Sequence, residues 1–479
     1  MAKYDYDLIV IGGGAAGLTS STFAGQTAAK TLLIEREEKL GGDCLHYGCV
    51  PSKTLIKSAY AYNVMRQAAK YGLPDVELPK VDLSKVRDRI RGVVDKIQEH
   101  DEPEYLEDKY NVETQFGSPK FLDKHTIELS GKEITARYFV VATGSTPFVP
   151  LIEGINDVPY ITNMQIFNLD ELPESMIVLG GGPIGMEMAQ SFARLGSKVT
   201  VVEFAPSILI REDEDIAAYM TEQMEAEGIN LLAKTKAVKV KHENGTFTVT
   251  VDKEGKTSTI QAQSLLVATG RKPNVDGLDL EKANVEYTPR GIKVNNKLQT
   301  TQKNIYACGD VNGGLAFTHV ASYEAVVAIT NMILKVPTKA NYTNTPWVTY
   351  LDPEVASIGY NETRACEAGI DYVLHKETLA HNDRALAEGE TKGFIKILIN
   401  KKSKPIGVQI VGYHAGDLIH EWVPVLNSKL KLSALTNSIH AYPTLSEINK
   451  NASVNYTVST IPSWTKGVLK MVFGYQGKV

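Results

Sequence analysis

Residues 8–35 read LIVIGGGAAGLTSSTFAGQTAAKTLLIE, a pattern that predicts a buried strand, a glycine turn, a helix and a second strand. In such a βαβ unit Gly12 makes the tight turn, and Gly14 lets a pyrophosphate approach the backbone. Gly17 allows the helix to pack closely. Glu35, at the end of the second strand, is placed to accept a hydrogen bond from a ribose 2′-OH. The stretch therefore predicts a dinucleotide-binding α/β domain at the start of the chain.

The same unit recurs 168 residues later, with glycines at 180, 182 and 185 and an acid at 203. Because Gly180, Gly182, Gly185 and Glu203 all keep the register, we predict a second nucleotide site. A carboxylate suits the free 2′-OH of NAD(H) and repels the 2′-phosphate of NADP(H), and the neighbouring Phe204 supplies no cation. The alternative for either acid is a solvated carboxylate at a strand end.

Each unit is followed by a buried strand that ends in a tight turn. These strands read FVVATG, ending at Gly144, and LLVATG, ending at Gly270. A further buried strand, IYACGD, ends at Asp310. The repeated order of these features supports a duplicated α/β architecture.

From residue 341 the pattern changes, and no third glycine fingerprint appears. Antiparallel strands are predicted at 347–350, 356–359, 394–400 and 405–411, and helices at 415–428 and 431–435. The polar residues His381, Asp383 and Arg384 are interpreted as a solvated loop. The predicted fold class is α/β, with two Rossmann-like dinucleotide-binding domains followed by a C-terminal α+β domain.

Composition excludes several classes of function. The formal charge of −5 argues against a general nucleic-acid binder. Four cysteines in 479 residues do not make a secreted disulfide framework, so the expected location is the cytoplasm. No apolar run approaches the ~20 residues of a membrane span. The tail at 464–479 carries lysines and apolar residues, but packing or fraying is favoured there over membrane contact, so membrane association is not expected.

Residues 41–53, GGDCLHYGCVPSK, hold the only close pair of cysteines. On an ideal helix Cys44 and Cys49 would point about 140° apart, so a disulfide needs the bend that Gly48 permits. Pro51 suits a first helical turn, which places Cys49 at a helix N-terminus that favours a thiolate. We predict a redox-active pair. The alternatives are two core cysteines or half of a zinc site, for which no second Cys/His pair is evident.

Together these motifs resemble the flavin-dependent pyridine nucleotide-disulfide oxidoreductases, which include dihydrolipoamide dehydrogenase, glutathione reductase and mercuric reductase. The resemblance covers essentially the whole chain. It implies FAD on the first unit, with Asp310 near the flavin's ribityl-pyrophosphate region, and NAD(H) on the second. It also implies that Cys49 faces the flavin and Cys44 meets the substrate, with Lys53 near flavin N5 and Glu187 as its ion-pair partner.

The resemblance also implies a division of the chain into domains. The FAD-binding domain is expected at 1–150 and the NAD(H)-binding domain at 151–276. Residues 277–344 are expected to complete the FAD domain, and 345–479 to form a dimerisation domain. The implied assembly is a homodimer in which the C-terminal segment of one subunit completes the active site of the other.

The sequence departs from the disulfide reductases in HAYPTLSE at 440–447. Those enzymes carry a histidine directly before the Pro-Thr of this motif, whereas here the position is Tyr442, with Glu447 retained. His440 lies two residues too early, and sequence leaves open whether it replaces the base. Histidine, with a pKa of ~6.5, suits proton transfer near neutral pH, while tyrosine, at ~10, does not. Mercuric reductase also has tyrosine here, although this chain lacks that enzyme's C-terminal cysteine pair and its N-terminal metal-binding domain.

Three functions follow as hypotheses. The first is a flavoenzyme that passes hydride equivalents from NADH through FAD to Cys44 and Cys49, and on to a small-molecule thiol or disulfide or a soft metal ion. The second is a dihydrolipoamide-dehydrogenase-like disulfide reductase. The third is a non-catalytic, redox-sensing flavoprotein. No resident metal site is predicted, although Cys44, Cys49 and Tyr442 of the partner subunit form one candidate site for a metal substrate.

Overall fold

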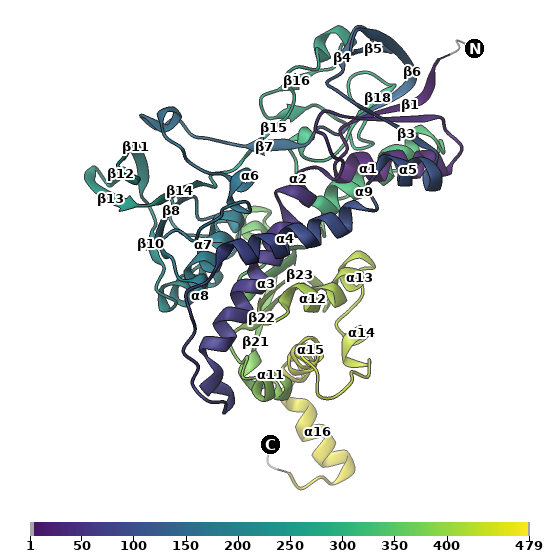
Figure 1. Cartoon of the computed structure of the whole chain (residues 1–479). Coiled ribbons are helices and arrows are strands. Elements are labelled where there is room, and N and C mark those ends of the chain that lie inside the picture. Colours follow the sequence, from purple (N-terminus) through teal and green to yellow (C-terminus); the bar gives the residue numbers. More distant parts are fainter. Residues whose placement is uncertain (1–3, 478–479) are drawn as a thin grey trace. The chain divides into compact units, whose positions relative to one another are not determined.

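The computed structural model describes residues 4–477 and has a mixed α/β fold, as the sequence predicts (Figure 1). The chain forms two compact units. The N-terminal unit comprises the chain up to Ala69, Leu73–Ile210 and Ala217–Asn341. The C-terminal unit comprises Lys70–Gly72, Arg211–Ile216 and the chain from Tyr342 onward. Within the described residues, no helix combines the length and the apolar character that crossing a bilayer requires.

The first sheet of the N-terminal unit has the strand order β3-β2-β1-β6-β5-β4, with β18 beside β6. Its central strands are parallel, and Ile11 of β1 lies between Ile34 and Val141. Both faces are covered, which explains the uninterrupted apolar runs of the sequence. The strands are β1 Tyr6–Ile11, β2 Thr31–Glu35, β3 Val112–Phe116, β4 Lys120–Phe121, β5 Thr126–Leu129, β6 Lys132–Val141 and β18 Ile305–Ala307.

Helices α1 and α9 run side by side against this sheet (Figure 1). Two further helices, α2 and α3, follow β2 and carry the cysteine motif, and Asp82 caps α4 by accepting from Ser84 N–H at 3.1 Å. The helices are α1 Ala15–Gln26, α2 Gly42–His46, α3 Cys49–Arg66, η1 Ala68–Tyr71, α4 Leu83–Gln98, α5 Pro103–Tyr110 and α9 Thr318–Met332.

A second parallel sheet repeats the arrangement in the order β10-β9-β8-β14. Leu179 of β8 lies between Val202 and Val267, as Ile11 does in the first sheet. An antiparallel sheet, β11-β12-β13, packs against it around Phe247. The elements are β8 Ser175–Leu179, α7 Pro183–Leu195, β9 Lys198–Val202, α8 Glu214–Ala226, β10 Asn230–Leu232, β11 Lys236–Glu243, β12 Thr246–Lys253, β13 Lys256–Ala262 and β14 Ser264–Val267.

Short elements join the two nucleotide folds. The pair β7 and β15 is antiparallel, and its strands follow directly on the turns after β6 and β14. The connecting elements are β7 Ser145–Pro147, η2 Ile155–Asp157, α6 Asn163–Ile166, β15 Arg271–Pro273, η3 Leu280–Ala283, β16 Tyr287–Thr288, β17 Gly291–Ile292 and η4 Asp310–Asn312.

The C-terminal unit is built on a five-stranded antiparallel sheet in the order β19-β20-β23-β22-β21. Four of its strands are predicted from sequence, while β21 escapes prediction because its residues are largely exposed. The strands are β19 Trp347–Thr349, β20 Glu354–Gly359, β21 Val373–Thr378, β22 Phe394–Ile399 and β23 Pro405–Gly412.

The helical stretch predicted at 415–428 is present and comprises α12, η6 and α13 in succession. Trp422 at the start of α13 is fully buried and donates to Asn449 Oδ1 at 2.8 Å, which ties α13 to α15. Sequence reasoning missed α15 and α16. The helical elements are α10 Glu362–Glu367, η5 Leu379–His381, α11 Asp383–Glu388, α12 Ala415–Leu418, η6 Ile419–Glu421, α13 Trp422–Asn427, α14 Ser433–Thr436, α15 Glu447–Ser459 and α16 Ser463–Phe473.

Candidate active site

A break between α2 and α3 sets the geometry of the cysteine pair. Cys44 lies in α2 and Cys49 is the first residue of α3, as its predicted place at a helix N-terminus requires. A Cβ at Gly48 would lie 2.8 Å from Asp43 O and 3.1 Å from Cys44 Cα. Glycine is therefore needed at the break, because any side chain would collide with the turn that carries Cys44.

The threonine that opens α9 bridges the two thiols. Thr318 Oγ1 donates to Cys44 Sγ at 3.1 Å and lies 3.4 Å from Cys49 Sγ. The hydrogen bond from Cys44 lowers the pKa of Cys49 to about 6; burial opposes this shift, while Thr318 and Lys53 add to it. The same hydrogen bond, with burial, raises the pKa of Cys44. Near neutral pH the pair is thus one thiolate, on Cys49, and one thiol, on Cys44.

An ion pair stands one helical turn from Cys49. Lys53 Nζ of α3 lies 2.8 Å from Glu187 Oε2 of α7. The Glu187 side chain is only 6% exposed, so its charge is held where α3 packs against the second nucleotide fold. The structure therefore brings together four sequence-predicted residues, the two cysteines, Lys53 and Glu187.

Both glycine turns are too tight for any other residue. Gly12 and Gly180 have φ of 106° and 112°, the left-handed region that favours glycine. A Cβ on Gly17 would lie 1.7 Å from Gly12 O, and one on Gly185 would lie 2.0 Å from Gly180 O. These contacts match the predicted roles of a tight turn and of close helix packing.

The middle glycine of each turn faces open space instead. A Cβ on Gly14 would meet nothing nearer than 3.8 Å, and one on Gly182 nothing within 4 Å. No side chain caps α1 or α7, and neither helix has an acid in its first turn. Free space beside uncapped helix N-termini is what a pyrophosphate requires. Both turns therefore fit a dinucleotide.

The two strand-end acids fold back onto the glycine turns. Glu35 Oε2 accepts from Gly13 N–H at 2.6 Å, and Glu203 Oε2 accepts from Gly181 N–H at 2.5 Å. The alternative of a solvated carboxylate does not describe either side chain, because both are bound to the turn itself. The neighbour of Glu203, Phe204, is exposed.

The remaining predicted cofactor residues lie at the ends of strands in the N-terminal unit. Gly144 follows β6 and Gly270 follows β14, both with positive φ. Asp310 begins η4, just beyond β18, and its Oδ2 accepts from Ser145 Oγ at 2.5 Å. Arg271 Nη2 lies 3.1 Å from Asp43 Oδ2, and its Nε lies 3.8 Å from Asp310 Oδ2. Arg271 therefore links Asp310 to the helix that carries Cys44.

Tyr442 belongs to the C-terminal unit and is 71% exposed. Its hydroxyl donates to Asp383 Oδ2 at 2.9 Å. This hydrogen bond raises the pKa of Tyr442 above its ordinary 10.0. Tyr442 is therefore a protonated phenol near neutral pH, and Asp383, at the start of α11, belongs to an ordered contact and not to a solvated loop.

The two other polar residues of the C-terminal motif have different partners. Glu447 Oε2 lies 3.3 Å from the backbone N–H of Thr444. His440 Nε2 lies 2.8 Å from Glu421 Oε1, and its side chain is only 8% exposed. The phenol of Tyr442 thus takes its carboxylate partner from α11, while Glu447 binds the backbone of its own motif.

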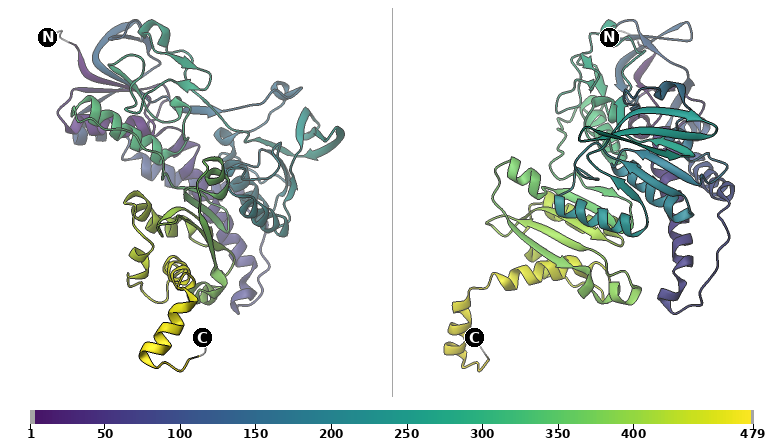
Figure 2. Two further views of the ribbon diagram at one scale, coloured as in Figure 1. Left: turned by 180° about the vertical axis from the view of Figure 1, so that it is seen from behind. Right: turned by 90° about the vertical axis from the view of Figure 1, so that its left-hand side faces the viewer.

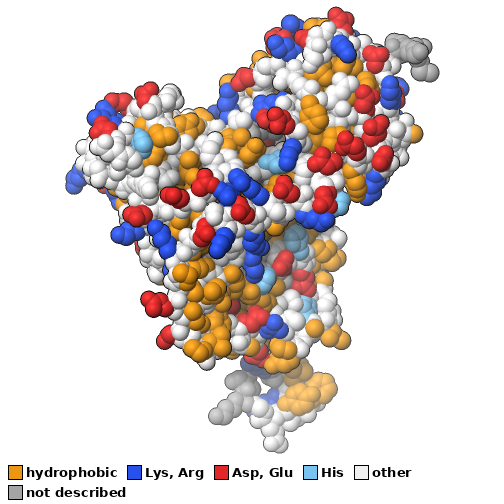
Figure 3. Space-filling view, viewed as in Figure 1, with side chains coloured by type: hydrophobic (Ala, Val, Ile, Leu, Met, Phe, Trp, Pro, Cys, Tyr) orange, Lys and Arg blue, Asp and Glu red, His pale blue; other side chains and the backbone are white. Residues whose placement is uncertain are grey.

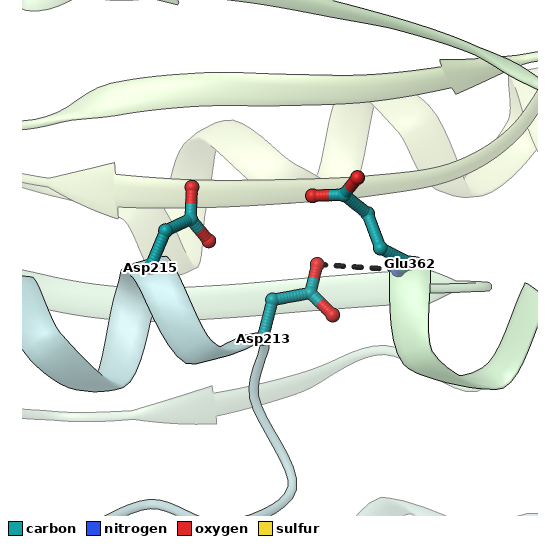
Figure 4. A group of neighbouring side chains, drawn as sticks. All are labelled: Asp213, Asp215 and Glu362. Atoms are coloured by element: carbon teal, nitrogen blue, oxygen red, sulfur yellow. Dashed lines mark hydrogen bonds between the residues drawn. The ribbon is translucent and has the colours of Figure 1, made fainter. Parts of the chain in front are cut away.

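Three carboxylates of the C-terminal unit converge closely enough to hold a cation. They are Asp213, Asp215 and Glu362, whose side chains face one another in Figure 4. The ammonium of Lys396 lies 3.0 Å from Asp213, 2.7 Å from Asp215 and 2.7 Å from Glu362. Lys396 is fully buried, so its charge takes the place that a metal ion would need.

Three site residues escaped sequence reasoning. Thr318 and Arg271 lie far along the chain from the cysteines they serve, and a threonine or arginine alone carries no motif. Asp383 follows two polar residues, which made a loop the simpler interpretation. The available signal for Thr318 and Arg271 was position, since each lies soon after a predicted buried strand of the nucleotide folds.

Known proteins match this chain along almost its whole length. The family model described as pyridine nucleotide-disulphide oxidoreductase matches residues 6–325, and the dimerisation domain of that family matches 345–453. A mercuric reductase of Staphylococcus aureus is 33% identical over 94% of this chain and 82% of its own. A dihydrolipoyl dehydrogenase of Geobacillus stearothermophilus is 34% identical over 93% of this chain and 95% of its own.

Solved structures of similar fold include a flavoprotein disulfide reductase. The HOCl-induced flavoprotein disulfide reductase RclA of Escherichia coli superposes with a TM-score of 0.84 at 27% identity, covering 94% of this chain and 99% of its own. Its Cu(II) complex also superposes with a TM-score of 0.84, covering 95% and 100%.

Proposed function

The chain belongs to the pyridine nucleotide-disulphide oxidoreductase family, and from that premise we propose that it is an NADH-dependent reductase of a soft metal ion. Like the other family members it is a flavin-dependent enzyme that uses FAD and NAD(P)H. The observation that carries the proposal is Tyr442, a phenol held by Asp383 at a position where disulfide reductases of the family place a base. The small number of cysteines favours the reducing cytoplasm as the site of action.

We assign the two glycine turns to the two cofactors. Gly12, Gly14, Gly17 and Glu35 hold FAD, together with Gly144 and Asp310. Gly180, Gly182, Gly185 and Glu203 hold NAD(H), together with Gly270. When bound, FAD accepts a hydride from the nicotinamide and supplies electron pairs to the cysteines. Glu203 favours NADH, because its carboxylate repels a 2′-phosphate.

The different acidities of the two thiols give them different roles. After an electron pair breaks the Cys44–Cys49 disulfide, Cys49 remains a thiolate near neutral pH, because its pKa is lowered to about 6. Cys44 takes up one proton and becomes the thiol, which then faces the acceptor. The Thr318 hydroxyl lies within hydrogen-bond distance of both sulfurs, at 3.1 Å from Cys44 Sγ and 3.4 Å from Cys49 Sγ. One disulfide, two electrons and one proton thus yield one thiolate and one thiol.

A soft metal ion suits this dithiol as an acceptor, because thiolates are its preferred ligands. Reducing one Hg(II) to Hg(0) takes two electrons, re-forms the Cys44–Cys49 bond and releases the proton of Cys44. Two Cu(II) ions would each take one electron with the same balance. Neither reduction requires a group that accepts and returns a proton, so a phenol with a raised pKa is no handicap. We propose that Tyr442 of the partner subunit adds an oxygen ligand, with Glu447 positioning its loop.

The test compares NADH oxidation with Hg(II), Cu(II), lipoamide and glutathione disulfide as acceptors. We expect the wild-type enzyme to use the metal ions and to be slow with both disulfides. Tyr442→His should raise lipoamide turnover by about 10²-fold, the lower range of general acid–base catalysis. Tyr442→Phe, which removes only the hydroxyl, serves as the control and should leave lipoamide turnover low. Rapid reduction of lipoamide by the wild-type enzyme would contradict the proposal.

A dihydrolipoamide-dehydrogenase-like activity is the second candidate, and the buried His440–Glu421 pair favours it. A histidine hydrogen-bonded to a carboxylate is the usual form of a proton shuttle. If wild type reduces lipoamide and His440→Gln abolishes that activity while diaphorase activity with an artificial acceptor remains, this second function is correct. If no acceptor, natural or artificial, supports turnover of the FAD-loaded protein, a redox-sensing role replaces both.

A further inference from the structure

The last helix of the described chain lies at the surface of the subunit. α16, Ser463–Phe473, has no buried residue. Trp464, Met471, Val472 and Phe473 are 62–79% exposed, and Val468 and Leu469 are 39% and 38% exposed. The helix follows α15 and stands apart from the five-stranded sheet in Figures 1 and 2, and apolar side chains gather there in Figure 3. Of the two expectations for this tail, packing or fraying, packing is not seen for this helix within the subunit.

The apolar residues of α16 form one broad face. At 100° per residue, the six apolar side chains cover an arc of about 200°. Lys466 and Lys470 lie side by side on the narrower remaining face, together with Ser463 and Gly467. Thr465 is the one polar residue within the apolar arc. A broad apolar face with a narrow basic one is typical of helices that lie in a membrane surface.

Charge distinguishes this segment from the rest of the chain. After Glu447 the sequence has four lysines and no acidic residue, although the whole chain has a formal charge of −5. Trp464 and Phe473, with Tyr475 stacked on Phe473 at 5.7 Å, supply the aromatic rings that favour the bilayer interface. Basic and aromatic residues together match anionic lipid headgroups above acyl chains.

We propose that α16 docks the enzyme on the surface of an anionic membrane. Eleven residues of helix extend about 16 Å, half the hydrocarbon thickness, so α16 lies in the plane of the surface and does not span it. The family's dimerisation domain ends at residue 453, so a dimer of the family type does not require α16. In a homodimer two such helices act together, which strengthens binding that one short helix would make weak. Membrane docking by α16 does not depend on which electron acceptor the enzyme reduces.

Flotation of the FAD-loaded enzyme tests the proposal, with vesicles of phosphatidylcholine alone or with 30 mol% phosphatidylglycerol. We expect binding to the anionic vesicles, its loss in 0.5 M salt, and at least about 10-fold weaker binding for Lys466→Glu/Lys470→Glu and for Met471→Ser/Phe473→Ser. The matched controls, Lys401→Glu/Lys402→Glu and the fully exposed Leu151→Ser, should bind like wild type. NADH oxidation with an artificial acceptor should be the same for every variant.

Fluorescence provides an independent readout of the same contact. Trp422 is fully buried and Trp464 is 67% exposed, so brominated acyl chains should quench chiefly Trp464, and Trp464→Phe should remove that quenching. Failure of the wild-type enzyme to float or to be quenched would overturn the proposal. So would a change of oligomeric state in the α16 variants without any change in vesicle binding, since that result assigns the apolar face to a second copy of the chain.

Discussion

Cys44 and Cys49 have the same side chain, but their surroundings shift their pKa values in opposite directions. Cys49 accepts the hydrogen bond of the other thiol, stands at a helix N-terminus and lies near Lys53, all of which favour negative charge. The Cys44 thiol donates a hydrogen bond to that thiolate. The hydrogen bond, burial and the neighbouring negative charge all raise the pKa of Cys44. At the scale of single residues, the environment therefore decides which sulfur is the thiolate and which is the thiol near neutral pH.

The acidity of Cys49 is measurable through the pH dependence of its alkylation. In the dithiol form, we expect the rate of reaction with iodoacetamide to fall as pH drops through about 6, where the thiolate is protonated. Thr318→Val removes a hydroxyl that lowers the pKa of Cys49, so the midpoint should move up. Thr318→Ser, which keeps the hydroxyl, should retain the wild-type midpoint. Mass spectrometry of the peptides identifies the alkylated cysteine, and an unchanged midpoint in Thr318→Val would exclude the role of this residue.

A second prediction at the residue scale concerns Glu203 and the choice between NADH and NADPH. Glu203→Arg replaces a charged acceptor for the ribose hydroxyl with a cation that suits a 2′-phosphate. The ratio of kcat/KM for NADH to that for NADPH should fall at least about 10-fold, the lower limit for a charged hydrogen bond. Glu203→Gln should give an intermediate ratio, because it removes the repulsion without adding a cation. A ratio that stays constant through both variants would refute the assignment.

At the scale of elements, breaks between helices and ion pairs between distant segments fix positions that one regular helix or strand could not fix. The break at Gly48 separates α2 from α3, so the cysteines need not share one helical axis. In the C-terminal unit, segment Arg211–Ile216 is attached to β22 through Lys396, whose ammonium contacts Asp213 and Asp215. Burial of Lys396 disfavours its charged form, but the three carboxylates more than offset this effect and raise the pKa of Lys396. The buried ammonium is thus a structural anchor.

Removing that anchor should destabilise the C-terminal unit. Lys396→Met leaves Asp213 and Glu362 without their counter-charge, while Asp215 keeps Lys376 at 3.2 Å. Breaking a buried ion pair in this way costs about 3–5 kcal/mol. Urea unfolding followed by the fluorescence of Trp347 and Trp422, both in this unit, measures the loss. Lys401→Met is the matched control, since its pair with Asp371 is exposed on both sides and the variant should unfold like wild type. Equal unfolding of the two variants would mean that Lys396 contributes no more than a surface lysine.

At the scale of the whole molecule, a duplicated nucleotide fold is followed by a domain that implies homodimers. The redox pair belongs to the N-terminal unit, while Tyr442 and Asp383 belong to the C-terminal unit. The family dimer offers a way for one subunit to supply the phenol to the other. In such an arrangement neither subunit alone has a complete acceptor site.

A mixed dimer distinguishes a shared site from one contained within a single subunit. Homodimers of Cys44→Ser and of Tyr442→Ala should both lose metal reduction. In a shared arrangement their heterodimer contains one site with intact Cys44 and intact Tyr442, so about half of the wild-type activity should return. Differently tagged subunits, co-expressed and purified through both tags, allow the measurement. No recovery would place both residues of each site in the same subunit.

The sequence by itself determined the α/β class, both glycine turns with their acids, and the position of the redox pair. These features depend on local periodicity and on glycines that no other residue can replace, so they can be read along the chain. Only the tertiary structure decided that Thr318 bridges the sulfurs, that Asp383 holds Tyr442, that Lys396 fills the carboxylate cluster, and that α16 is left uncovered. These contacts join residues far apart in sequence through single hydrogen bonds or charges, and no periodic pattern encodes which segments will meet.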